Sequence, residues 1–297
     1  MIAKILATLT TLLLRLLGAK RRRLESGAVS LVYYDLGPRN GEPWVLLHGL
    51  GATAATWAPI LQAFRKNCRM LAPELSSLGG TRSPGHGLKM KQAVEIVREL
   101  IDKELGGRPV TLAGISLGGW MATRFALRHP ERVSRLVLIA AGGYRDQDWD
   151  NIQTLITVND LAGVDRLYKA LFVRAPWVMR VSRPTFLAAY TSPGVRYVLG
   201  ELTEADTFQD DDLARIRVPT SVIWAEHDGL FRLEAGRAMA AALPRAHFEI
   251  LPDCGHAAHM ECPKKLVKAL QRFRKATGLQ SSPDPYTEAP PWPNPTT

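Results

Sequence analysis

Cysteine is scarce in this chain, and so are long apolar runs. The 297 residues include only Cys68, Cys254 and Cys262, an odd number without the close-spaced pairs of zinc sites or disulfide frameworks. We therefore expect unpaired thiols and a reducing compartment, with no metal and no cofactor. The apolar run near the amino terminus has about sixteen residues, fewer than the roughly 20 that a bilayer-spanning helix needs. A simple membrane-spanning helix is not expected.

Acidic residues are absent from positions 1–23, although the whole chain carries both signs of charge. The formal net charge is +10. Six cations lie in this one segment: Lys4, Arg15, Lys20, Arg21, Arg22 and Arg23. The rest of the chain is only mildly basic and has no recognisable nucleic-acid motif, so a nucleic-acid partner is not expected.

The pattern within residues 1–23 is that of a helix lying in a membrane interface. Polar and charged side chains recur at helical spacing on one stripe, beside a leucine-rich face: Lys4, Thr8, Thr11 and Arg15. A cleaved signal peptide is the rival interpretation of this segment. The basic cluster that follows, Lys20–Arg23, opposes export and favours a cytoplasmic location for the next domain. We expect membrane association through residues 1–23, with a helix packed on its own domain as the alternative.

The middle of the chain alternates between strand-like and helix-like segments. Seven short apolar runs are typical of strands: VSLVYYD, WVLLH, RMLAP, PVTLA, SRLVLIAA, TSVIWA and HFEIL. Their alternation with helical patterns predicts an α/β fold, a mostly parallel sheet flanked by helices. We expect this core at 24–143 and 217–278, a helical lid inserted at 144–216, and a disordered Pro-rich tail at 279–297.

Ser116 stands between Gly114 and Gly118, after the strand PVTLA and before a helical segment. A sharp strand-to-helix turn of this kind pushes the serine hydroxyl out at the carboxyl edge of the sheet, where open α/β proteins bind ligands. Helix capping is the alternative role for the serine. A serine hydroxyl becomes a strong nucleophile only when a base takes its proton, so partners are needed.

Asp228 and His256 are the expected partners, because each follows a predicted strand and would emerge at the same sheet edge. The chain order Ser, Asp, His is the one used on α/β-hydrolase sheets. Glu226 is the alternative acid, two residues before Asp228. We expect His259 to lie on the turn after His256, and His48 to orient a loop through hydrogen bonds.

Four blocks carry a resemblance to the α/β-hydrolase family between about Val29 and Ala276: HGLG, AGISLGGWMA, WAEHD and GHAAHMECP. The resemblance implies that Ser116 is the nucleophile, His256 the general base and acid, and Asp228 the residue that orients the imidazole. It implies an oxyanion hole formed by the backbone amides of Leu50 and Leu117. Glu74 departs from the aspartate that many relatives have after the strand RMLAP, which leaves the shape of that turn open.

Three functions follow from this resemblance. The first is hydrolysis of carboxylic esters with apolar acyl chains, through an acyl-serine intermediate, as in monoacylglycerol-lipase-like hydrolases with an amino-terminal membrane segment. The second is carbon–carbon bond hydrolysis, because SLGGWMA also occurs in that branch, and the third is binding without catalysis. Aromatic side chains are expected to contact the substrate: Trp120, Trp177, Phe186 and Phe231. The head group, the acyl chain length and the oligomeric state are left open. So are the role of the Pro-rich tail and the choice between a spanning and an in-plane amino-terminal helix.

Overall fold

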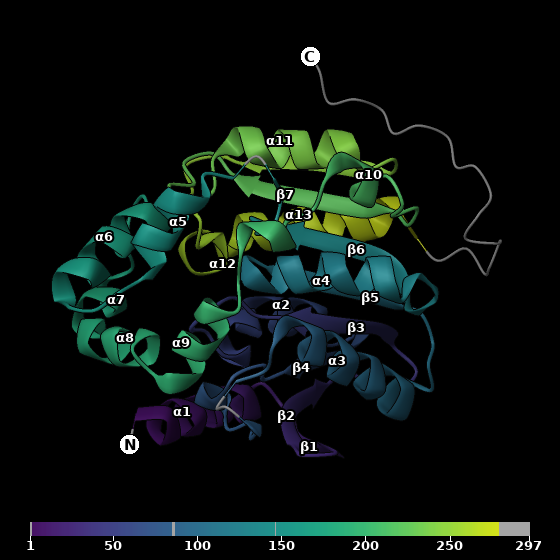
Figure 1. The fold of residues 1–297 in the computed structure, drawn as a ribbon. Coiled ribbons are helices and arrows are strands. Elements are labelled where there is room, and N and C mark those ends of the chain that lie inside the picture. The colour runs from purple at the N-terminus through teal and green to yellow at the C-terminus, as the bar shows by residue number, and fades with distance from the viewer. Residues whose placement is uncertain (1, 85–86, 146, 279–297) are drawn as a thin grey trace.

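In the computed structural model, which describes residues 2–84, 87–145 and 147–278, eight strands form one sheet in the order β1-β2-β4-β3-β5-β6-β7-β8 (Figure 1). The strands are β1 (Lys20–Ser26), β2 (Val29–Leu36), β3 (Glu42–Leu47), β4 (Cys68–Pro73), β5 (Val110–Ile115), β6 (Val133–Ile139), β7 (Thr220–Ala225) and β8 (Ala246–Leu251). β3 to β8 pair in parallel, whereas β1 and β2 pair antiparallel with their neighbours. The predicted tail at 279–297 lies outside the described residues.

All seven predicted strands are present, and β1 is the strand that sequence patterns missed. Its sequence KRRRLES buries one side chain, Leu24, which pairs with Leu31 of β2. A half-buried strand normally shows alternating apolar residues. A single apolar residue among cations gives no such alternation, so β1 is recognisable only from its pairing.

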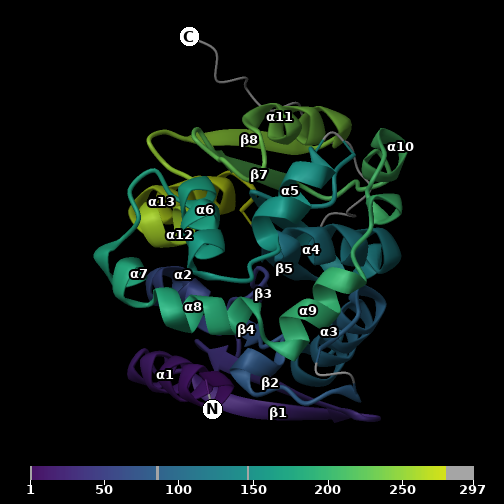
Figure 2. The same cartoon turned by 60° about the vertical axis from the view of Figure 1, so that its left-hand side comes forward.

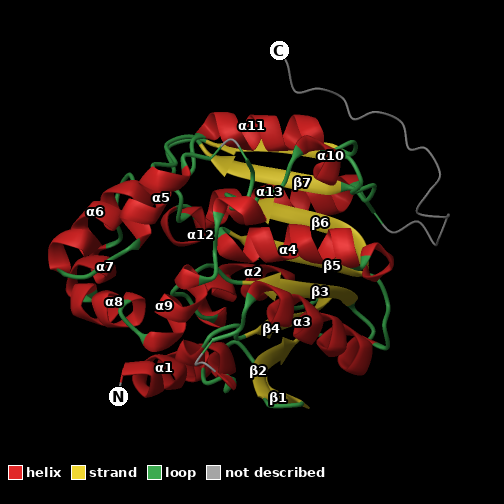
Figure 3. Cartoon of the chain, in the orientation of Figure 1, coloured by secondary structure: helices red, strands yellow, loops and turns green. Residues whose placement is uncertain are grey.

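Helices cover both faces of the sheet (Figure 3). Their bounds are α1 (Ile2–Leu16), α2 (Ala58–Phe64), α3 (Met90–Leu105), α4 (Leu117–Arg128), α5 (Trp149–Ile156), α6 (Leu161–Leu171), α7 (Trp177–Val181), α8 (Arg183–Tyr190), α9 (Pro193–Gly200), α10 (Asp210–Leu213), α11 (Leu233–Ala242), α12 (Ala258–Glu261) and α13 (Pro263–Ala276). Successive residues of β3 enter different cores, because side chains alternate across a strand. Val45 and Leu47 belong to the buried cluster that includes residues of α3, α4 and α11, while Trp44 and Leu46 belong to the one that includes residues of α2 and α13.

The segment between β6 and β7 contains helices α5 to α10. In Figures 1 and 2 these helices, apart from α10, lie beyond the carboxyl ends of the parallel strands. They are the helices that we expect to act as a lid. Their position places them over the edge of the sheet where ligands bind in open α/β folds.

The amino-terminal segment differs from the predicted membrane helix of residues 1–23. Helix α1 ends at Leu16, and Lys20–Arg23 belong to β1, so the boundary between this helix and the sheet core falls before Lys20. α1 packs on its own domain: Leu14 is fully buried, and Thr11 Oγ1 is 2.8 Å from the hydroxyl of Tyr34. Thr11, placed on the polar stripe of the predicted interfacial helix, therefore faces the protein.

The opposite side of α1 remains apolar and exposed. Four leucines there are between 42% and 77% exposed: Leu9, Leu12, Leu13 and Leu16. In the part of the chain that the structure describes, no helix combines the length and the hydropathy required to cross a membrane.

Candidate active site

Ser116 lies in a sharp turn between β5 and α4, as its glycine-flanked pattern predicts. Its backbone dihedral angles are φ 55° and ψ −119°, which L residues rarely adopt. The turn is held by backbone hydrogen bonds: the Ser116 N–H donates to the Ile139 carbonyl at 3.0 Å, and the Ser116 carbonyl accepts from Gly142 at 3.1 Å. Such backbone strain costs on the order of 1–3 kcal/mol and clusters at functional sites.

The two flanking glycines are required by close approach of backbone. A Cβ atom on Gly114 would lie 2.1 Å from the carbonyl oxygen of Gly118, and one on Gly118 would lie 2.1 Å from that of Leu47. Backbone atoms cannot move aside as a flexible side chain can. The glycines therefore let α4 start directly behind Ser116 and against β3.

Asp228 and His256 form a buried pair. The two residues follow β7 and β8, and Nδ1 of His256 is 2.8 Å from Oδ2 of Asp228. The other carboxylate oxygen accepts the backbone N–H groups of Leu230 at 2.9 Å and Phe231 at 2.8 Å. The ring of Phe231 also packs edge to face on the imidazole, with centroids 4.9 Å apart. These contacts fix the orientation of the imidazole. Nδ1 is hydrogen-bonded to the carboxylate, and Nε2 is available to take up a proton.

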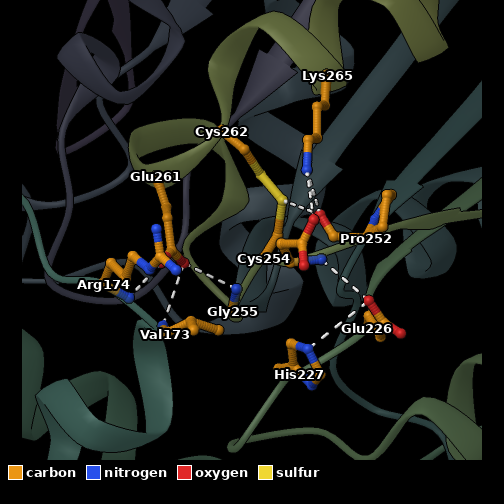
Figure 4. The surroundings of a disulfide bond; sticks show 11 residues. Val173, Arg174, Glu226, His227, Pro252, Cys254, Gly255, Glu261, Cys262 and Lys265 are labelled. Atoms are coloured by element: carbon orange, nitrogen blue, oxygen red, sulfur yellow. Dashed lines mark hydrogen bonds and ion pairs between the residues drawn. A yellow bond between two sulfur atoms is a disulfide. The ribbon is translucent and has the colours of Figure 1, made fainter.

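Glu226, the alternative acid, does not contact His256. Its side chain is exposed and accepts the backbone N–H of Asp253 at 3.0 Å, and it lies 3.7 Å from Nε2 of His227 (Figure 4). The geometry therefore pairs the imidazole with Asp228.

His48 makes the structural hydrogen bonds that we expect of it. Its Nε2 accepts the Leu75 N–H at 3.0 Å, so Nδ1 carries the proton and donates to the Gly49 carbonyl at 2.9 Å. Burial lowers the pKa of His48 to about 4, which keeps the ring neutral. A Cβ on Gly49 would lie 3.4 Å from the Cβ of Ser116, so this loop, which continues into Leu50, runs beside the serine.

Glu74, in the turn after β4, contacts both ends of the loop that runs from His48 to Ala54. One carboxyl oxygen accepts the Ala54 N–H at 3.1 Å, and the other lies 3.7 Å from Nε2 of His48. Burial raises the pKa of Glu74 to about 8, so the group is protonated at neutral pH. A Cβ on Gly79 would lie 2.0 Å from Oε2 of Glu74, so glycine at that position leaves room for the longer acid.

A cavity of about 570 Å³ joins these parts. Ser116 and His256 line it, together with both residues of the predicted oxyanion hole, Leu50 and Leu117. Three of the four predicted aromatic contacts line it as well: Trp120, Phe186 and Phe231. Most of the remaining lining is aliphatic or aromatic, so the cavity suits an apolar ligand.

Trp177 does not line the cavity, which corrects its predicted role. It begins the short helix α7, and its side chain is 76% exposed. Other lining residues were not predicted as substrate contacts, among them Leu13, Trp149, Phe172, Met179, Tyr190 and Met260. They come from α1, the insertion and α12, where periodic patterns mark an apolar face but not what that face covers.

His259 lies in α12 and lines the cavity near His256. Its buried Nδ1 has no hydrogen-bond partner in the described part of the chain. Burial, with a smaller contribution from His256, lowers its pKa to about 3. The ring is therefore neutral at physiological pH, and the hydrogen bond between His256 and Asp228 does not involve it.

Cys254 and Cys262 form a disulfide, which corrects the expectation of unpaired thiols (Figure 4). The bond spans eight positions of sequence, and helix α12 folds the segment back so that the two Cα atoms lie 6.4 Å apart. Spacing alone did not reveal this fold-back. Cys68 remains a free, buried thiol.

Comparisons with known proteins identify the family to which this fold belongs. The model of the alpha/beta hydrolase family matches residues 44–269. Monoacylglycerol lipase ABHD6 of Bos taurus is 25% identical over 284 residues, covering 87% of this chain and 83% of the relative. A 2-hydroxy-6-oxo-2,4-heptadienoate hydrolase of Pseudomonas putida is 26% identical over 274 residues, covering 86% and 96%.

A solved structure has the same fold. Carboxylesterase CesB from Bacillus subtilis superposes with a TM-score of 0.79 at 21% identity, covering 94% of this chain and 99% of that chain. Because the family match runs from β3 into α13 and includes every element that positions Ser116, Asp228 and His256, the chain belongs to the alpha/beta hydrolase family.

Proposed function

We propose that the protein is a serine hydrolase that cleaves carboxylic esters of apolar acyl chains, with monoacylglycerol-like lipids as the substrate class. One observation carries the proposal: a strained serine and a histidine held by a buried aspartate line the same apolar cavity. The name of the mammalian relative, a monoacylglycerol lipase, supports the same class.

In the proposed reaction, Oγ of Ser116 attacks the ester carbonyl carbon while Nε2 of His256 takes the hydroxyl proton. Asp228 accepts a hydrogen bond from Nδ1–H of His256, keeps its negative charge and stabilises the imidazolium. The backbone N–H groups of Leu50 and Leu117 stabilise the oxyanion. His256 then donates its proton to the leaving alcohol, which leaves an acyl group on Ser116. Water, deprotonated by His256, attacks the carbonyl carbon of this acyl-serine. The acyl–Oγ bond then breaks as His256 returns the proton to Oγ of Ser116, and the fatty acid is released.

The cavity chemistry favours a neutral ester over the substrate of a carbon–carbon bond hydrolase. The Pseudomonas putida relative is named for a dienoate, which carries a carboxylate. Among the described residues that line the cavity there is no lysine or arginine. Burying a carboxylate without a cationic partner costs free energy, whereas burying an acyl chain among apolar side chains is favourable.

Covalent labelling tests the nucleophile. A fluorophosphonate probe should label the wild type and the Ser134→Ala control, which changes a serine at the amino end of β6, but not Ser116→Ala. The same proteins should be assayed with monoacylglycerols and with a dienoate carbon–carbon substrate. Labelling of Ser116→Ala at the wild-type rate would refute the assignment. A wild type that neither reacts with the probe nor turns over either substrate would favour the binding-protein alternative.

We further propose that the protein associates with membranes through the exposed leucines of α1, and that the cavity opens toward the bilayer. Leu13 and Met260 are both exposed and both line the cavity, so they lie at its mouth. Trp177 and Val181 of α7 add exposed apolar surface. The sequence of α1 contains Lys4 and Arg15 but no acid, which suits an anionic surface.

Point substitutions test this surface better than truncation, because deleting residues 1–23 would remove four of the seven residues of β1. Cosedimentation with anionic liposomes should fall for the double variant Leu12→Gln/Leu16→Gln. It should stay at the wild-type level for Leu161→Gln, an equally apolar exposed position on α6. Turnover of a short soluble ester should be unchanged in both. Equal liposome binding by all three proteins would contradict the membrane proposal.

The basic cluster and the disulfide favour opposite sides of the membrane for this domain. The basic cluster after α1 favours the cytoplasmic face. The Cys254–Cys262 disulfide removes the argument from unpaired thiols, because disulfides persist mainly in oxidising compartments.

A further inference from the structure

Glu261, the last residue of α12, joins two parts of the molecule that are far apart in sequence. Its carboxylate accepts three backbone N–H groups, those of Gly255 at 2.8 Å, Val173 at 3.3 Å and Arg174 (Figure 4). Gly255 directly precedes His256. Val173 and Arg174 follow α6 in the insertion. Hydrogen bonds from backbone N–H groups to a carboxylate are charge-assisted, and are roughly twice as strong as neutral ones.

On either side of Glu261, the loop that carries His256 also packs closely against the insertion. We call this contact the boundary between the two. The Ala257 N–H donates to the Leu171 carbonyl at 2.9 Å, and a Cβ on Gly255 would lie 2.7 Å from that oxygen. Leu171 and Phe172 are also walls of the cavity. The segment that carries His256, with Gly255 and Ala257 on either side, therefore lies in direct contact with the inner wall of the insertion.

Two further constraints hold Glu261 in place. Its own N–H donates to the Ala257 carbonyl at 3.0 Å, within the turn of α12. Its neighbour Cys262 is bonded to Cys254, at the other end of the loop that carries His256. The carboxylate is thus presented to the insertion from a short, covalently closed loop. No step of the proposed reaction uses it.

We propose that Glu261 is a positioning residue that fixes the His256 loop against residues 171–174, so that the base and the wall of the acyl pocket keep one geometry. The role rests on the ester hydrolysis proposed for Ser116. A misplacement of about 1 Å at a reacting group can cost on the order of 10²-fold in rate. Loss of the carboxylate removes its hydrogen bonds to the His256 loop and to the insertion at once.

Glu261→Gln is the informative substitution, because glutamine keeps the size of the side chain but has a single acceptor oxygen. Its amide N–H₂ would face a backbone N–H group. We expect kcat for p-nitrophenyl esters to fall by about 10-fold or more. We also expect the downfield proton resonance of the His256–Asp228 hydrogen bond, identified by its absence in His256→Ala, to shift or broaden. Glu261→Asp should recover part of both.

Glu226→Gln is the matched control. Glu226 also accepts a backbone N–H of this loop, that of Asp253, but from the exposed side and without reaching the insertion (Figure 4). Its kcat and its downfield resonance should match the wild type. All variants should be compared below their melting temperatures, so that unfolding does not enter the rates.

The two proposals fail in different ways. A wild type without probe labelling or ester turnover would overturn the proposed function, and the resonance would still report on Glu261. An active wild type, with kcat and resonance in Glu261→Gln equal to those in Glu226→Gln, would overturn the positioning role alone.

Discussion

At the scale of single residues, two acids with one residue between them lie in different environments. Asp228 is buried against His256, whereas the carboxylate of Glu226 is in solvent. Asp228→Asn should lower kcat/KM for a soluble ester by at least about 10²-fold, because an asparagine no longer holds the imidazole in the productive tautomer. Glu226→Gln should leave kcat/KM within about twofold of the wild type. This change leaves the buried Asp228–His256 pair intact, so the activation barrier of the reaction should not change. Circular dichroism should confirm that both variants are folded. The reverse pattern of activities would identify Glu226 as the acid.

Glu74 permits a prediction about pH and stability. Its pKa is raised by burial from 4.5 to about 8, so between these values the unfolded chain is ionised there while the folded protein still holds a proton. The folded state then binds more protons than the unfolded state, and stability falls as pH rises. The free energy of unfolding of the wild type, relative to Glu74→Gln, should decline across this window by up to about 1.4 kcal/mol per pH unit.

Urea denaturation of both proteins between pH 4 and 9 measures this difference. Titration of His48 and of other groups common to the two proteins largely cancels in the comparison. A difference independent of pH would mean that Glu74 is ionised in the folded protein.

At the scale of elements, α1 has one face in the core and one in solvent. Leu14 is fully buried, while Leu16 is 77% exposed. Leu14→Ala should lower the free energy of unfolding by about 2–5 kcal/mol. Leu16→Ala should change it by less than about 0.5 kcal/mol. Chemical denaturation distinguishes the two, and a small effect of Leu14→Ala would show that α1 detaches from the sheet core.

At the scale of the whole molecule, the cavity is assembled from three separate parts: α1, the sheet core and the insertion. A lining of this kind should bind longer acyl chains better until the cavity is filled. Each buried methylene contributes about 0.8 kcal/mol, or up to about fourfold in kcat/KM. A series of p-nitrophenyl esters of increasing chain length should therefore rise and then level off. A steady decline from the two-carbon ester would contradict an acyl-chain pocket.

Local sequence by itself determined much of this protein. The alternation of apolar runs predicted seven of the eight strands, and the G-x-S-x-G pattern predicted the turn at Ser116, because strand periodicity and glycine geometry act over a few residues. The chain order and strand-end positions brought Asp228 and His256 to one sheet edge, where the structure pairs them.

Tertiary structure alone decided the rest. The strand β1 has no apolar alternation and is defined by its partner β2. Trp177 and Phe186 are both aromatic residues of the insertion, yet one faces solvent and the other the cavity. The Cys254–Cys262 bond and the contacts of Glu261 with Val173 and Arg174 join segments by their proximity in space. Such contacts arise when separate elements pack together, so no periodicity along the chain records them.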